Sequence, residues 1–240
     1  MSDAKIRLCV EHPLGSGQSV PLTRDQAHYL FGVMRLGEGS RVLLFNGRDG
    51  EWLAEVTDAG KRGGELDCLE QTQSLRPPPD LWLLFAPVKK ARTDFIVEKA
   101  VEMGVARILP VQTDYTNSER IRRDRLQAHA KEAAEQCGAT VVPEVADLQK
   151  LDQVLDGWPA DRQLLFCDET RAGAGDSLAG ATRGPWAIVI GPEGGFSDNE
   201  RERLRKLPQM TQICLGPRIL RSDTAAVAAL TLWQSTLGDW

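Results

Sequence analysis

The chain has 240 residues, 42% of them hydrophobic and 26% charged, and its formal net charge is −5. This composition is typical of an ordinary soluble globular protein with a sizeable core, and the negative charge does not by itself indicate a nucleic-acid binder. The N-terminus has no apolar stretch of the kind that a secretory signal needs, and the longest apolar runs are too short to span a bilayer. We therefore expect a cytoplasmic protein with no membrane partner.

The five cysteines and three histidines are scattered along the chain and include no CxxC pair. This distribution argues against a disulfide framework and against a zinc site, and it fits reduced thiols in a cytoplasm. The alternative is a nucleophilic cysteine paired with His129, but no signature of a cysteine-dependent enzyme surrounds Cys137, Cys167 or Cys214. We expect these thiols to be buried and inert.

Residues 1–73 predict a small β-barrel or sandwich. Hydrophobic residues alternate over 41–56, and the Asn-Gly and Asp-Gly pairs inside that stretch are a strong hairpin signal. A short helix is predicted over 23–34, because Thr23 and Gln26 have the spacing of a capping box.

The segment 74–80, SLRPPPD, contains three consecutive prolines and predicts a stiff spacer between two domains. From residue 81 to residue 240 the pattern alternates between strands and helices, which predicts an α/β domain with a parallel sheet and helices on both faces. The expected strands cover 81–87, 105–112, 140–145, 163–169, 186–190 and 212–216, and the expected helices cover 92–104, 124–138, 147–156, 198–207 and 224–236.

Ligands of open parallel sheets bind beyond the carboxyl ends of the strands. Three predicted strand ends carry glycine-containing loops, FCDETRAGAG at 166–175, IGPEGGF at 190–196 and LGPRILRSDTA at 215–225. None contains a phosphate-binding GxxxxGK[ST] motif or a complete GxGxxG, so we expect a ligand such as an adenine ring held by exposed backbone groups. Ser197 and Glu200 predict a capping box after the second loop, and residues 222–224 offer N-caps for the last helix.

Two kinds of charged residue stand out in the sequence, one acidic residue in a glycine loop and several clusters of basic residues. Glu193 lies within a glycine turn, where it either contacts a ligand or fixes the loop. Basic residues cluster at 89–92, 120–125, 201–206 and 218–221. Each cluster alone could be a solvated face, but together they favour an anionic ligand.

The motif IGPEGGFSDNE at 190–200, followed by LGPRILRSDTAAVAAL at 215–230, resembles the SPOUT methyltransferases of the RsmE type. Other stretches are similar to the same family in the same order, so that the resemblance covers nearly the whole chain. They are HYLFGVMRLGEGSRVLLFNGRDGEW at 28–52, FIVEKAVEMGVARILPVQTDYTNSER at 95–120 and EAAEQCGATVVPEV at 132–145.

The resemblance implies a fold and an activity. The expected domains are a PUA-like, RNA-binding β-barrel at 1–73, a proline-rich linker at 74–80 and a SPOUT methyltransferase domain with a deep trefoil knot at 81–240. The expected cofactor is S-adenosylmethionine, without a metal, in a homodimer with active sites near the subunit interface. The implied reaction is methylation of N3 of a uridine in 16S ribosomal RNA of the small ribosomal subunit.

For this reaction we expect roles for individual residues. Arg221 is expected to stabilise the developing uridine anion or its phosphate, unless it only holds its loop by a salt bridge, and Glu193 to orient the base or accept a proton. Thr224 is expected to close the cofactor pocket. The implied cofactor-binding residues are Phe166, Cys167, Glu169, Gly191, Pro192, Gly194, Gly195, Leu215, Gly216, Ile219, Leu220 and Thr224. From the basic clusters we expect RNA binding by Lys89, Lys90, Arg92, Arg120, Arg122 and Arg123.

The chain departs from the family at Ala139, where many members have an arginine. The cluster at 120–125 is the nearest candidate to replace that arginine in binding RNA. Two other functions stay open, a SPOUT enzyme that methylates the ribose 2′-hydroxyl of transfer or ribosomal RNA, and a non-catalytic RNA-binding protein. The PUA-like region in front of the motif pair argues against the first, and the intact glycine loops argue against the second.

Overall fold

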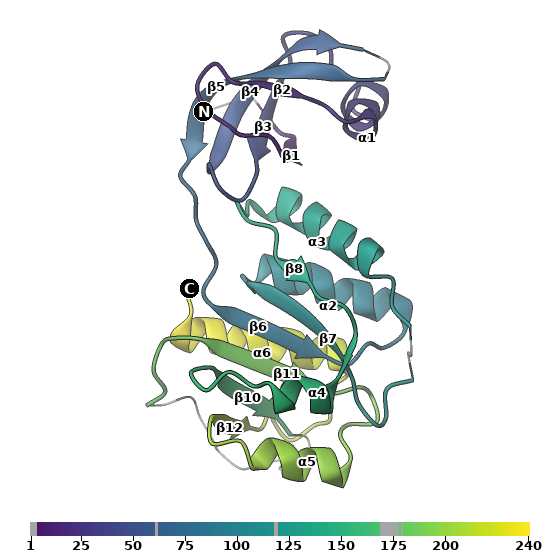
Figure 1. Ribbon diagram of the computed structural model, residues 1–240, viewed down its shortest axis with the longest axis vertical. Helices are drawn as coiled ribbons and strands as arrows, with labels where there is room; N and C mark the ends of the chain where they lie inside the picture. The colour runs from purple at the N-terminus through teal and green to yellow at the C-terminus, as the bar shows by residue number, and fades with distance from the viewer. Residues whose placement is uncertain (1–3, 61, 118–119, 169–177, 179) are drawn as a thin grey trace. The chain divides into compact units, whose positions relative to one another are not determined.

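The computed structural model describes residues 4–60, 62–117, 120–168, 178 and 180–240 (Figure 1). The chain divides into two compact units. The N-terminal unit consists of Met1–Pro77 and Ala134–Val142, and the C-terminal unit consists of Pro78–Ala133 and Pro143–Trp240.

The N-terminal unit contains a curled five-stranded sheet with the strand order β1-β3-β4-β5-β2. The strands are β1 (Arg7–Cys9), β2 (Ser19–Pro21), β3 (Arg41–Phe45), β4 (Glu51–Ala59) and β5 (Gly64–Gln73). β3 and β4 form the predicted hairpin, whose turn is closed by the side-chain oxygen of Asn46, which accepts from the backbone N–H groups of Arg48 and Asp49. Apolar side chains from all five strands form one core under this sheet.

The predicted helix at 23–34 begins as expected and then changes its hydrogen bonding. Thr23 and Gln26 form both bonds of the capping box in front of α1 (Arg24–Ala27). The next six residues, η1 (His28–Val33), are a π-helix, and the N–H of Met34 donates to the carbonyl of Tyr29. The sequence missed this change because residue types do not distinguish a π turn from an α turn.

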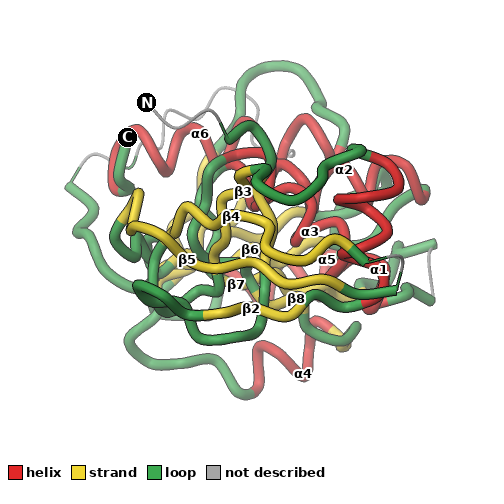
Figure 2. Tube along the Cα trace, turned by 90° about the horizontal axis from the view of Figure 1, so that it is seen from above, coloured by secondary structure: helices red, strands yellow, loops and turns green. Residues whose placement is uncertain are grey.

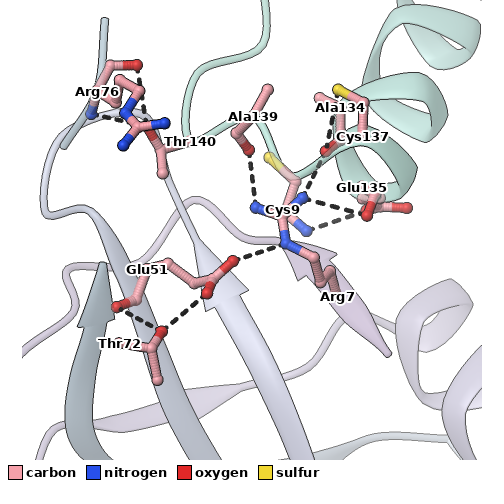
Figure 3. A network of polar contacts seen from close by, with 10 residues as sticks. All are labelled: Arg7, Cys9, Glu51, Thr72, Arg76, Ala134, Glu135, Cys137, Ala139 and Thr140. Atoms are coloured by element: carbon pink, nitrogen blue, oxygen red, sulfur yellow. Dashed lines mark hydrogen bonds and ion pairs between the residues drawn. The ribbon is translucent and has the colours of Figure 1, made fainter. Parts of the chain in front are cut away.

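The segment 134–142 is bonded into the N-terminal unit through Arg7 (Figure 3). The guanidinium of Arg7 donates to the carbonyls of Ala134 and Ala139, at 2.5 and 2.8 Å, so that it caps the last turn of α3 (Arg123–Cys137). The same guanidinium pairs with the carboxylate of Glu51 at 2.6 Å, and both side chains are about nine-tenths buried. Thr72 donates to the second oxygen of Glu51 at 2.8 Å, which completes a buried network.

The C-terminal unit confirms the predicted α/β class. Its main sheet has the order β12-β10-β11-β6-β7-β8, and all of its pairings are parallel. The strands are β6 (Leu81–Phe85), β7 (Arg107–Gln112), β8 (Glu144–Val145), β10 (Gln163–Cys167), β11 (Trp186–Ile190) and β12 (Met210–Ile213), and the short strand β9 (Gln149–Lys150) pairs with β7. β11 is buried along its whole length, as expected for a strand covered on both faces.

Helices cover both faces of this sheet; Figure 2 draws helices in red and strands in yellow. The helices besides α3 are α2 (Lys90–Glu102), α4 (Leu151–Asp156), α5 (Asp198–Arg205) and α6 (Ser222–Leu237). α4 and α5 contribute to one core with Leu84, Phe166 and Val189 of the sheet. Because side chains alternate along a strand, the neighbouring residues of these strands point to the opposite face, where α6 packs against β11 and α2 packs against α6.

Several predicted elements are shorter than expected, and two of them lose the most residues. The strand expected at 140–145 is reduced to β8, since its first residues belong to the N-terminal unit. The helix expected at 147–156 begins only at Leu151, because Gln149 and Lys150 pair with the end of β7 instead. Both differences come from tertiary contacts that a local pattern does not contain.

Candidate functional site

The loops at the carboxyl ends of β10, β11 and β12 line a cavity of about 250 Å³. These strands are neighbours in the sheet, so the glycine loops at 190–196 and 215–225 lie together with the end of β10. This is the position at which open parallel sheets bind ligands. The cavity is lined by Cys167, Asp168, Ile190, Gly191, Pro192, Glu193, Gly194, Gly195, Cys214, Leu215, Gly216, Pro217, Arg218, Ile219, Leu220, Ser222 and Ala225.

Each glycine of the GPEGG loop also has a local reason to lack a side chain. A Cβ on Gly191 would lie 2.8 Å from the ring of Phe196, and a Cβ on Gly194 would lie 3.1 Å from the Cβ of Tyr115. Gly195 has a φ of 69° and its N–H donates to the carbonyl of Pro192 at 2.9 Å, which closes a tight turn. The loop therefore presents mainly backbone to the cavity.

The start of α5 fixes this loop to the loop that follows β7. Ser197 and Glu200 form the predicted capping box. The hydroxyl of Ser197 also donates to Asp114 at 2.6 Å, and the N–H of Asp114 donates to the buried carboxylate of Glu200 at 2.9 Å. The first turn of α5, which follows the GPEGG loop, is therefore held by two hydrogen bonds to Asp114 in the turn after β7.

The loop at 215–225 is joined to the GPEGG loop by Ser222, whose hydroxyl donates to the carbonyl of Gly191 at 2.8 Å. This contact corrects the expectation that residues 222–224 cap the last helix. The N-cap of α6 is Arg221, without a side-chain cap, because the hydroxyl of Ser222 is used across the cavity. Ile219 of this loop is 81% exposed although it lines the cavity.

Asp168 lies within the predicted loop at 166–169, but the sequence assigned it no role of its own. Its carboxylate is fully buried, accepts from Arg205 at 2.7 Å and from Gln212 at 2.9 Å, and lies 3.5 Å from Arg201. A charged residue directly after a buried strand was the available signal. Asp168 holds the end of β10 to β12 and α5, so that it forms a fixed wall of the cavity.

The Cys167 thiol in the cavity wall is a poor nucleophile. Burial raises the pKa of the Cys167 thiol to about 12, with a smaller contribution from Cys214. Cys167 therefore stays protonated at neutral pH, as expected for an inert thiol. The expected burial of the three thiols was wrong, because Cys137 is exposed on the last turn of α3 and Cys167 and Cys214 are only half-buried.

Most of the predicted cofactor residues line this cavity, but two described ones do not. Phe166 is fully buried in the core beneath it, where its ring meets the ring of Phe196 edge to face at 5.3 Å. Thr224 is exposed in the first turn of α6, and Ser222 and Ala225 form the wall instead, since residues three apart share a helix face. Glu169 lies outside the described residues.

The two predicted catalytic residues differ in position. Glu193 is exposed and lines the cavity. Arg221 is exposed next to the lining residues Leu220 and Ser222. Within the described part of the chain, the guanidinium of Arg221 makes no hydrogen bond or ion pair, so the salt bridge considered from the sequence is not formed there.

A second cavity, of about 300 Å³, brings together part of the predicted RNA-binding set. It is lined by Val88, Lys90, Thr93, Arg120, Ile121, Arg122, Arg125 and Leu126, at the starts of α2 and α3. Arg125 forms two bonds to Asp94, and Arg122 pairs with Asp124. Among the described residues, Lys90 and Arg120 have no ion-pair partner and are therefore available to an anion.

The remaining members of the predicted set lie outside this basic cavity. Lys89 is exposed at the N-cap of α2. Arg92 pairs with Asp223 at 3.8 Å, and Arg123 donates to the carbonyl of Val145 at 2.8 Å. Arg92 and Arg123 thus also have structural partners.

The described residues hold neither a metal-ligand cluster nor a membrane-spanning helix. No group of three or more His, Cys, Asp or Glu side chains in this part of the chain could hold a metal ion. Likewise, none of the described helices is long and apolar enough to cross a membrane.

Comparison with known proteins assigns the class. A family model described as an RNA methyltransferase domain matches residues 76–234, and a model described as an RNA methyltransferase PUA domain matches residues 22–67. The two models together define an RNA methyltransferase with a PUA domain in front of its parallel α/β domain.

Individual relatives narrow this class. The ribosomal RNA small subunit methyltransferase E of Rickettsia conorii is 28% identical over 93% of both chains. The Synechocystis protein of the same name is 30% identical over 88% of this chain and 71% of its own. A crystal structure of the Neisseria gonorrhoeae enzyme of that name, bound to S-adenosyl methionine, superimposes with a TM-score of 0.88 at 28% identity and covers 98% of this chain and 99% of its own. The chain belongs to the ribosomal RNA small subunit methyltransferase E family, which confirms the resemblance seen in the sequence.

Proposed function

We propose that the protein transfers a methyl group from S-adenosylmethionine to N3 of a uridine in 16S ribosomal RNA. The observation that carries this proposal is the cavity at the ends of β10, β11 and β12, where the GPEGG and LGPRIL loops meet. Similarity over nearly the full length to a relative solved with S-adenosyl methionine supports it.

The cavity suits the proposed cofactor chemically. Its lining combines the glycine-containing loops with the apolar residues Ile190, Leu215 and Leu220. Such a combination fits a flat adenine ring, which needs apolar contact on its faces and hydrogen bonds at its edge. Residues 191–195 and 215–220 would hold the cofactor.

The protein has to position the base and manage charge, because neutral N3 of uridine is a poor nucleophile. The cofactor, when bound, supplies an electrophilic methyl group on its sulfonium. N3 must lose its proton as the new N–C bond forms, and negative charge develops on the base. We assign Arg221 to stabilise this charge, since its guanidinium is always protonated and has no described partner. Glu193 orients the base or accepts the proton, and a water molecule is the other acceptor.

The rest of the molecule contributes RNA affinity. We propose that Lys89, Lys90, Arg92, Arg120, Arg122 and Arg123 bind RNA backbone together with the PUA domain, and that the substrate is the small ribosomal subunit or its RNA. We also propose that the protein works in the cytoplasm as a homodimer. The apolar side chain of Ile219, exposed beside the cavity, supports a subunit contact there.

Calorimetric titration with S-adenosylmethionine tests the cofactor site. We expect the wild-type protein to bind and the double variant Gly194→Val, Gly195→Val not to bind. A valine at 194 meets Tyr115, and a valine at 195 cannot adopt the required φ of 69° without strain. The variant Gly157→Ala is the control, because a Cβ there meets no atom closer than 4.0 Å. Equal binding by the double variant and the wild type would place the cofactor elsewhere.

Digestion of methylated RNA to nucleosides then separates the functions that the sequence left open. 3-Methyluridine supports the proposed reaction, whereas a 2′-O-methylated nucleotide would replace it by ribose methylation. Cofactor binding without any methylated product from small subunits would favour a non-catalytic RNA-binding protein.

The basic cavity makes a separate prediction about salt dependence. We expect the double variant Lys90→Ala, Arg120→Ala to bind 16S RNA more weakly. The steepness with which the logarithm of the association constant falls with log salt should decrease by about 1 to 2, because each lost phosphate contact removes about 0.7 to 0.9. The control is Lys206→Ala, whose exposed ammonium already pairs with Glu202. A slope equal to the control value would exclude phosphate binding by Lys90 and Arg120.

A further inference from the structure

Tyr115 is a half-exposed aromatic residue on a rigid turn. Its side chain is 50% exposed and follows β7 in the turn formed by residues 113–116. The N–H of Thr113 donates to the hydroxyl of Thr116 at 2.9 Å, the two hydroxyls lie 2.8 Å apart, and the N–H of Thr116 donates back to the carbonyl of Thr113 at 3.1 Å. These bonds fix the backbone that carries the ring.

The same turn is attached to the rim of the cofactor cavity. Asp114 is bonded to Ser197 and Glu200, at the start of α5. Tyr115 packs against Gly194, because a Cβ on that glycine would lie 3.1 Å from the Cβ and 3.7 Å from the Cδ2 of Tyr115. Gly194 lines the cavity and Tyr115 does not, so the Tyr115 side chain lies next to this part of the cavity wall and is not inside the cavity.

The surroundings of Tyr115 favour a nucleobase over a phosphate. Asp114 and Glu193 are both exposed near it, and their charges repel a polyanionic backbone. A neutral base has no such penalty, and unstacked bases in RNA are commonly held on the faces of aromatic side chains. The ring is also pre-organised, so little conformational freedom is lost on stacking.

We propose that Tyr115 is a substrate-binding residue, a stacking platform that holds the target pyrimidine of single-stranded RNA beside the cofactor cavity. This inference rests on the proposed methylation of a uridine and adds the residue that positions its base.

The test compares Tyr115→Ala, Tyr115→Phe and the wild-type protein in methylation of unmethylated small ribosomal subunits. We expect the alanine variant to lower kcat/KM for the subunit by about 5- to 150-fold, the range expected when one stacked base is lost. The phenylalanine variant should stay near wild type, because stacking uses the ring and not the hydroxyl. Phe95→Ala, which removes another exposed aromatic side chain of the same unit, is the control and should have no effect.

Two further measurements keep this test separate from the others. Titration with S-adenosylmethionine should give the same Kd within about twofold for all four proteins, whereas a loss in Tyr115→Ala that matches its loss of activity would mean that Tyr115 only supports the Gly194 loop. Affinity for oligouridylate should fall in Tyr115→Ala and not in Phe95→Ala. If it does not fall, the stacking role is wrong, even where the wild-type protein methylates RNA. If the wild type makes no methylated uridine, the proposed function fails, and the oligouridylate affinities still judge the stacking role.

Discussion

Replacing Arg221 with alanine is expected to lower kcat for methylation of the small ribosomal subunit by about 10²- to 10³-fold, as for the loss of one donor to a developing anion. The reason is the position of the guanidinium, exposed at the N-cap of α6 between two residues of the cavity wall and without a partner in the described part of the chain. The Kd of S-adenosylmethionine should change by less than about twofold, because Arg221 is not part of the wall itself.

Single-turnover kinetics and calorimetry on the same preparations check this prediction. Arg183→Ala is the matched control, since Arg183 is exposed just before β11, at the opposite end of the strand from the cavity. Arg221→Lys should recover only part of the rate, because an ammonium keeps the charge but not the planar pair of donors. A loss of cofactor binding that accounts for the lost activity would assign Arg221 to the cofactor and not to the base.

Replacing Arg7 with alanine is expected to destabilise the N-terminal unit by about 3–5 kcal/mol, the usual cost of breaking a buried ion pair. The substitution leaves Glu51 buried with only Thr72 as a described side-chain partner, and it frees the carbonyls of Ala134 and Ala139. Hydrogen exchange of the amides in β3, β4 and β5 measures this loss within the unit, and it does not require the whole chain to unfold in one step.

Arg41→Ala is the control for this effect. Arg41 lies on the neighbouring strand and pairs with Glu55 at 3.8 Å, but both side chains are exposed, so the loss should stay below about 1 kcal/mol. The double variant Arg7→Met, Glu51→Leu should recover the part that comes from the unpaired charge and leave the part that comes from the uncapped carbonyls. Equal exchange in Arg7→Ala and Arg41→Ala would show that the network does not stabilise the unit.

Local patterns predicted the fold class because each domain follows a different periodicity. Alternation and the Asn-Gly pair predicted the β3–β4 hairpin, and the alternation of strands and helices predicted the parallel sheet. The errors lie where distant residues decide the conformation, as at Gln149 and Lys150, which β7 takes into the sheet.

The parts of the site that consist of glycine loops were predicted from their motifs. The parts that depend on side chains from distant elements were missed. The glycine loops were recognisable as sequence, and the structure places both of them at one cavity. Asp168, although inside a predicted loop, and Tyr115 were given no role, because their surroundings come from β12, α5 and the GPEGG loop, all distant along the chain. Thr224 was expected in the cavity wall but lies on the exposed face of α6, and motif matching does not distinguish the faces of a helix.

The membership of residues 134–142 in the N-terminal unit has a consequence for how the protein is made. Chains emerge from the ribosome N-terminus first, and domains generally fold as they become complete. Here the sheet of residues 1–73 is synthesised long before the carbonyls of Ala134 and Ala139 that Arg7 binds. The N-terminal unit is therefore complete only after residues 134–142, within the following domain, have been synthesised. A fragment that ends at the proline-rich segment would lack this part of the unit.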